Sequence, residues 1–152
     1  MARERARHPA PAQAPVALNE KGQALTALLK ETLQELQPEI VYSHWRGDLN
    51  RDHKIIAEAV EVATRPLPGC PVKEVYAFEI PGDRQFVPDV WVVMSVSDLH
   101  DKEEQMSIKY MSELQMWPHP RSKRGIESQA KYRGMQCGHE YAEAFQVVRI
   151  VR

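Results

Sequence analysis

Cysteine is scarce in this chain of 152 residues, where only Cys70 and Cys137 occur and no CxxC pair is formed. Two isolated cysteines exclude a disulfide-stapled scaffold and favour a reducing, cytoplasmic location. Long hydrophobic runs are missing too. The strongest apolar block, residues 90–94, is five residues long, whereas a membrane helix needs roughly 20. We therefore expect no membrane span.

A surplus of charge of one sign is also absent. Lys and Arg number 20 against 21 Asp and Glu, which gives a formal net charge of -1. Binding to nucleic-acid phosphates needs a cationic surplus, so this balance argues against nucleic acid as the main partner. Hydrophobic residues make up 43% and charged residues 27% of the chain. These proportions indicate an ordinary globular domain.

The length predicts one domain with a short extension at its start. Residues 1–18 hold three arginines and then a stretch of proline and alanine, without the apolar core of a secretory signal. We expect a disordered tail over residues 1–18 and one folded domain over residues 19–152.

Hydrophobic periodicity and capping residues define the expected elements. One helix is expected over residues 20–37, and a second follows Asn50 and is ended by residues 65–69. A third is expected from a cap at residue 97 or 98 to about residue 116, and a fourth from residue 122 to about residue 134. Strands are expected over residues 39–43, 72–78, 90–95 and 145–151. Asn50 suits the N-cap of the second helix, Ser97 or Asp98 that of the third, and Gly134 the C-terminal cap of the fourth. The alternation of helices and strands favours an α/β fold with a mainly parallel sheet.

The densest group of polar residues follows the first expected strand, and its members are His44, Asp48, Asn50, Asp52 and His53. Ligands of α/β sheets bind outside the carboxyl ends of strands, so the location suits a site. The positive end of the following helix stabilises the Asp52 carboxylate and favours a neutral imidazole, the form that binds a metal. Alternatively, the acids and the asparagine only cap and solubilise the start of the helix. The spacing leaves both interpretations open.

A second polar group lies in the loop of residues 118–122, where two prolines restrict the backbone around His119 and Arg121. A rigid loop that presents these side chains suits binding of an anion or a sugar, because Arg offers a fixed fork of donors. The alternative is a stiff loop with exposed charges. Two acids beside expected strands, Glu79 and Glu143, are interpreted as surface residues.

Taken together and in order, these motifs resemble the PIG-L/LmbE-like deacetylase family. The segments that carry the resemblance are residues 42–44 (YSH), 47–53 (GDLNRDH), 65–66 (RP), 78–79 (FE), 118–122 (PHPRS), 133–134 (RG) and 142–145 (AEAF). The resemblance covers roughly residues 20–150. It implies a Rossmann-like fold and removal of acetyl groups from N-acetylated sugars or sugar conjugates, usually with zinc.

The resemblance also implies roles for single residues. His53 falls on a zinc ligand of the family, and Asp48 and Asp52 become orienting groups around it. The residues that line the substrate are then Asn50, His119 and Arg121. The family's early His-Pro-Asp-Asp segment, which supplies two further zinc ligands and the general base, has no match in this sequence. Since a catalytic zinc needs about three protein ligands, we expect impaired deacetylase activity.

The missing segment also affects the expected architecture. We expect an incomplete Rossmann-like three-layer sandwich that lacks its N-terminal portion. Its absent strands would leave an exposed sheet edge or face, which favours association into a homo-oligomer. Besides an impaired enzyme, two alternatives stay open: a non-catalytic remnant that binds a partner, and a small sugar- or anion-binding module.

Overall fold

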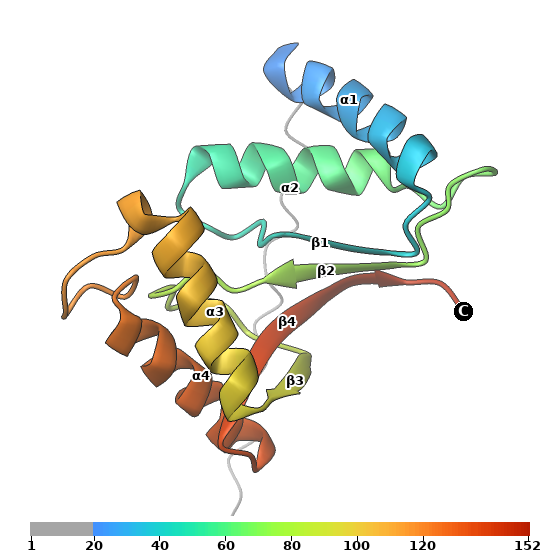
Figure 1. The fold of residues 1–152 in the computed structure, drawn as a ribbon. Helices are drawn as coiled ribbons and strands as arrows, with labels where there is room; N and C mark the ends of the chain where they lie inside the picture. The colour runs from blue at the N-terminus through green and yellow to red at the C-terminus, as the bar shows by residue number, and fades with distance from the viewer. Residues whose placement is uncertain (1–19) are drawn as a thin grey trace, which may run out of the picture.

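The computed structural model describes residues 20–152, which form one four-stranded sheet with helices packed around it (Figure 1). The expected tail over residues 1–18 lies outside the described residues. In chain order the elements are α1 (Glu20–Leu36), β1 (Ile40–His44), α2 (Arg51–Ala63), β2 (Glu74–Phe78), β3 (Val90–Met94), α3 (Val96–Lys109), the 3-10 helix η1 (Met111–Glu113), α4 (Lys123–Cys137) and β4 (Tyr141–Ile150). Within residues 20–152, none of the helices combines the length and the apolar character that crossing a membrane demands.

The first two helices follow the sequence pattern closely. The Asn50 side chain accepts a hydrogen bond from the backbone N–H of Asp52 at 2.9 Å, so Asn50 is the N-cap of α2 as predicted. One face of α2 packs with α1 and the sheet. The buried side chains of this core are Leu33, Val60, Val72 and Val75. Their burial fixes α2 against β1 and β2, with α1 stacked on the outside (Figure 1).

The predicted C-terminal ends of the last two helices are wrong, and so is the predicted cap of α3, whereas α4 begins after Ser122 as predicted. Ser95 caps α3 in a reciprocal pair with Asp98, and α3 ends at Lys109 instead of continuing to residue 116. The chain there turns back on itself, and the N–H of Gln115 donates to the carbonyl of Arg121. That bond replaces the continued helix ladder.

Helix α4 continues past Gly134 to Cys137, and Gly138 caps it with a φ of 80°. Gly134 is needed inside the helix instead. A Cβ at this position would lie 2.6 Å from the carbonyl oxygen of Glu140, so only glycine allows α4 to approach the start of β4 so closely.

The expectation of a mainly parallel sheet is wrong. The strand order is β1-β2-β4-β3, and only β1 and β2 pair in parallel. Strand β4 runs antiparallel to both β2 and β3. The reason lies in the connections: one helix between β1 and β2 returns the chain for a parallel strand, whereas α3 and α4 together reverse it once more before β4.

Strand β4 joins two halves of the sheet. Phe145 faces Phe78 at the end of β2 on one side and Val90 at the start of β3 on the other. The residues of β4 before Phe145 pair with β3, and those after it pair with β2. The end of β2 and the start of β3 therefore lie at the same level of the sheet, separated by one strand.

The layers differ from the expected sandwich. Helix α2 covers one face of β1 and β2, while α3 and α4 lie around the first half of β4 (Figure 1). On the opposite face of β1, Tyr42 is 54% exposed. In the part of the chain that the structure describes, this end of the sheet has helices on a single face, so three layers are not complete there.

Candidate functional site

The carboxyl end of β1 and the start of α2 bring Asp48 and His53 together. Oδ2 of Asp48 lies 2.5 Å from Nδ1 of His53, and Oδ1 accepts the backbone N–H of Asn50 at 2.9 Å. Asp48 is only 6% exposed. Its burial raises the pKa of this carboxyl, but the hydrogen bonds from Asn50 and His53 outweigh that effect and leave the pKa below its ordinary value. The contact leaves Nε2 of His53 as the ring nitrogen open to a ligand.

His44 adds a second imidazole to this group. Its ring centroid lies 4.2 Å from that of His53 and 4.8 Å from that of Phe78. Burial lowers the pKa of His44 and the charge of His53 lowers it further, while Asp48 acts in the opposite direction. Nδ1 of His44 is buried and has no hydrogen-bond partner among the described residues. The resemblance gives His44 no role, and the contact with His53 depends on the turn between them.

The other two polar residues of this segment are exposed. The Asn50 side chain is occupied with capping α2, as the simpler of the two interpretations predicts. Asp52 lies in the first turn of α2. Its carboxylate forms no hydrogen bond or ion pair with any described residue. Their proposed roles toward a ligand remain predictions.

A complete metal centre does not fit the described residues. Within residues 20–152, no three or more His, Cys, Asp or Glu side chains are arranged to hold a metal ion. The His44 ring packs against the His53 ring at a tilt of 31°, and Asp48 occupies the Nδ1 side of His53, so the three groups do not converge on one point. A catalytic zinc needs three protein ligands and an open position. Among residues 20–152, this group therefore offers no complete set of zinc ligands.

Next to this group, a cavity of about 340 Å³ lies between α3, α4 and the first half of β4. Its apolar lining includes Phe78, Ile126, Ala130, Ala142, Ala144 and Phe145. Polar side chains from α3 and from the loop before α4, Lys102 and Arg121, also line it. Lys102 forms an ion pair with Glu143, and Arg121 forms one with Glu113. The cavity therefore combines an apolar interior with paired charges.

The loop residues His119 and Arg121 behave differently. Arg121 lines the cavity, in line with its predicted place at a ligand. His119 is exposed, and its Nδ1 accepts the backbone N–H of Arg121 at 3.1 Å. The structure thus gives His119 a part in holding the loop, and a contact of His119 with a ligand stays a prediction.

Glu79 and Arg133 form a buried ion pair beside the cavity. Nε and Nη2 of Arg133 donate to the two carboxylate oxygens of Glu79 at 2.7 and 2.5 Å. The side chains are 9% and 6% exposed for Glu79 and Arg133, so the interpretation of Glu79 as a surface acid is wrong. The sequence shows Arg133 beside a glycine, which does not by itself indicate a buried ion pair. The fold reveals that its partner lies 54 residues away in the chain.

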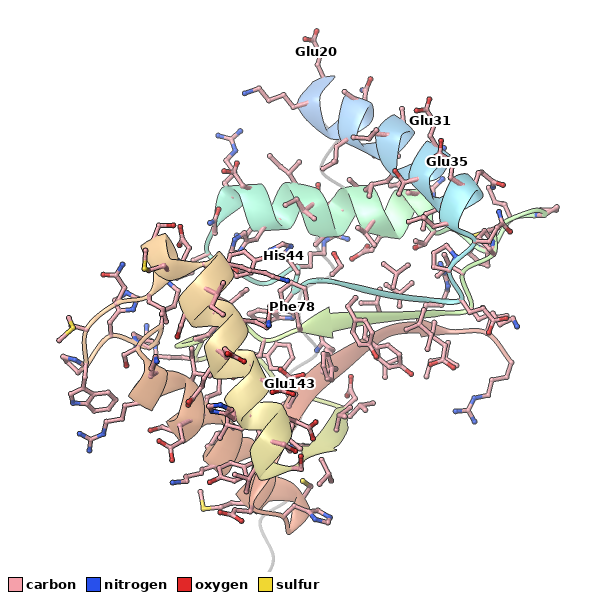
Figure 2. The ribbon with its side chains drawn as sticks, viewed as in Figure 1. Glu20, Glu31, Glu35, His44, Phe78 and Glu143 are labelled. Atoms are coloured by element: carbon pink, nitrogen blue, oxygen red, sulfur yellow. The ribbon has the colours of Figure 1, made fainter. Side chains whose placement is uncertain are left out.

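The histidines and the cavity adjoin each other. Figure 2 shows His44 at the end of β1, Phe78 at the end of β2 and Glu143 on β4, one below the other beside α3. Phe78 contacts the His44 ring and also lines the cavity. We therefore treat the histidine pair, Asp48 and the cavity as one candidate site.

Comparisons with known proteins support the fold. No protein-family model matches the chain, and a search of the curated proteins finds no match. Solved structures do match. The conserved protein TT1542 from Thermus thermophilus is 22% identical with a TM-score of 0.65, over 85% of this chain and 60% of that one. The chain shares the fold of this protein.

Two further structures are similar. GalB, the 4-carboxy-2-hydroxymuconate hydratase of Pseudomonas putida KT2440, is 22% identical with a TM-score of 0.61, over 93% of this chain and 63% of that one. The A40926 pseudoaglycone deacetylase Dbv21 is 16% identical with a TM-score of 0.54, over 90% and 62%. The chain therefore spans about three fifths of the length of these structures. At such identities the likeness shows a common fold.

Proposed function

We propose that the chain carries part of the site of a zinc-dependent N-deacetylase, a hydrolase of N-acetylated sugars or sugar conjugates. We further propose that the chain by itself hydrolyses amides weakly or not at all. The observation that carries it is the Asp48–His53 contact at the carboxyl end of β1, which leaves Nε2 of His53 open. The motifs in residues 42–145 and the fold shared with a deacetylase support the assignment.

The chemistry of the Asp48–His53 contact matches that of a ligand imidazole. A histidine that binds a metal donates its other ring N–H to a carboxylate or carbonyl, which fixes its tautomer and raises its basicity. Asp48 fills that role because it is buried and is held in turn by the Asn50 N–H. Hydrolytic zinc needs about three protein ligands, and residues 20–152 show no such group, which is why we propose impaired activity.

The cavity supplies the proposed place for the substrate. Its volume of about 340 Å³ lies within the range of ligand pockets. Arg121 and Lys102 offer donors to the hydroxyl, carbonyl or anionic groups of a sugar conjugate, and the apolar lining suits the hydrocarbon face of a sugar ring or an acyl group.

Zinc titration of the full chain by calorimetry, with emission spectroscopy of the metal retained, tests the ligand role. We expect one weak binding event that disappears in His53→Ala and weakens about 10- to 100-fold in Asp48→Asn. His100→Ala is the matched control, because His100 is an exposed histidine on α3, and it should leave the titration unchanged. Zinc binding that survives His53→Ala would remove the basis of the assignment.

Hydrolysis of an N-acetylglucosamine derivative tests the activity. We expect release of acetate at or near the background rate in the presence of zinc. Tight stoichiometric zinc together with robust acetate release would contradict the proposal that activity is impaired.

The cavity also favours a second candidate function, a non-catalytic sugar- or anion-binding module. It rests on the presence of Arg121 and Lys102 beside an apolar cavity, independently of His53. Calorimetric titration with the same N-acetylglucosamine derivative distinguishes the two. Binding that is lost in Arg121→Gln but kept in His53→Ala, without hydrolysis, would favour the module.

A further inference from the structure

The outer edge of β1 presents unpaired peptide groups. In the described part of the chain, β1 pairs only with β2. The carbonyl of Glu39 accepts the N–H groups of Lys73 and Glu74, so the peptide groups of odd-numbered residues point toward β2. Those of Ile40, Tyr42 and His44 therefore point to the open edge, with Tyr42 at the centre of the strand.

The same strand bears one end of an exposed aromatic row. The Tyr42 ring stacks on Tyr76 at 5.7 Å and contacts Phe145 at 5.2 Å. All three lie on the face of the sheet that α2 does not cover. Ile40 and Tyr42 are 46% and 54% exposed. An open strand edge that also carries exposed apolar side chains is a template for pairing with another chain.

We propose that this edge binds a second copy of the chain, with the two β1 strands antiparallel and Tyr42 on the two-fold axis. In this register Tyr42 faces its own copy, and Ile40 of each chain faces His44 of the other. A residue whose N–H and C=O both point outward exchanges two hydrogen bonds with its counterpart in an antiparallel pair, and Tyr42 meets that requirement. The edge is thus complementary to itself, as a two-fold interface must be.

Side chains around the edge agree with a second copy as the occupant. The two Tyr42 rings fall on the same face and join the aromatic rows of both chains across the axis. Glu39 precedes β1 and Arg46 follows it, with 66% and 38% of their side chains exposed. Within each chain Glu39 pairs with Lys73, and Arg46 pairs with Glu58 and Glu61, so the charges that flank β1 are already neutralised before a second copy approaches. The outcome is one continuous sheet through both copies. This inference does not rest on the proposed function.

Sedimentation of the full chain tests the proposal. We expect a dimer of twice the 17.4 kDa monomer mass. Tyr42→Lys places like charges opposite each other on the axis and should weaken association at least about ten-fold. The matched control is Val93→Lys, since Val93 lies on the other edge strand and is 51% exposed. It should leave the dimer intact. A monomer in the unaltered chain, or dissociation only in Val93→Lys, would overturn the proposal.

Crosslinking tests the register directly and does not depend on how Tyr42→Lys folds. In a background with Cys70→Ser and Cys137→Ser, Tyr42→Cys should form a disulfide-linked dimer on mild oxidation. Directly opposed residues of a hydrogen-bonded antiparallel pair have Cα atoms about 5.5 Å apart, which a disulfide can span. Val93→Cys in the same background should stay uncrosslinked. Crosslinking of both variants to the same extent would indicate unspecific association and refute the proposed interface.

Discussion

The buried Glu79–Arg133 pair gives the sharpest test of how this fold is held together. Both carboxylate oxygens accept from the guanidinium, at 2.7 and 2.5 Å, and Nη1 donates to Gln136 at 2.8 Å. The side chains are 9% and 6% exposed. Removing one partner leaves a buried charge without compensation. We expect Glu79→Leu or Arg133→Met to lower the free energy of unfolding by about 3–5 kcal/mol.

The double variant should behave differently from the sum of its parts. Replacing both partners by apolar side chains of similar volume removes both charges, so its loss should be no greater than that of either single variant. Additivity would instead require about 6–10 kcal/mol, the sum of the two single losses. For a chain of this length, the loss in a single variant corresponds to a fall of about 6–20 °C in Tm.

Urea unfolding followed by circular dichroism measures all four proteins of this cycle. The surface pair Glu127–Lys131 on α4 is the control, with 40% and 52% of the side chains exposed and a contact of 2.8 Å. Its removal should leave the stability almost unchanged, because water screens an exposed pair. Single losses at Glu79 or Arg133 as small as this, or a double variant that equals the sum, would refute the reasoning.

Three further predictions concern stability. Because the pKa of His44 is lowered by its burial and by His53, the unfolded chain binds more protons near pH 6, and stability should fall as pH drops below about 6.5. His44→Gln should reduce that slope in urea unfolding between pH 7.5 and 5, by at most about 1.4 kcal/mol per pH unit; an unchanged slope would contradict the assigned environment. Gly134→Ala places a Cβ 2.6 Å from the Glu140 carbonyl and should destabilise by about 1–3 kcal/mol, whereas Gly69→Ala meets no atom and strains only its positive φ. Asn50→Ala removes the side-chain cap of α2 and should lower the free energy of unfolding by about 1 kcal/mol in the same urea experiment. An unchanged free energy would show that this cap does not stabilise α2.

Local patterns predicted most of the elements, because helices and caps depend on neighbouring residues. The leucine spacing located α1, and Asn50 located the start of α2. The beginning of β4 was missed, since Ala142 and Ala144 have little strand propensity and form a strand through their pairing with β3. Strand direction was also beyond local patterns, because it depends on which strands pair, and β4 pairs with strands that lie far from it in the chain.

The sequence identified the residues of the candidate site, but not which of them contact each other. The polar segment of residues 44–53 indicated the location, since polar residues between a strand and a helix are typical of ligand sites in α/β folds. Which acid contacts His53 depends on the turn that returns Asp48 to α2, and Asp52 makes no such contact among the described residues. The Glu79–Arg133 pair was unpredictable, because its partners are distant in the chain.

Strand β4 has a mechanical consequence. Among residues 20–152, the lobe of α1, α2, β1 and β2 and the lobe of β3, α3 and α4 share their sheet only through this strand, with Phe145 at the junction. If β4 loses its hydrogen bonds to one lobe, its pairing with the other lobe is weakened as well. Both lobes should therefore unfold together, in a single thermal transition.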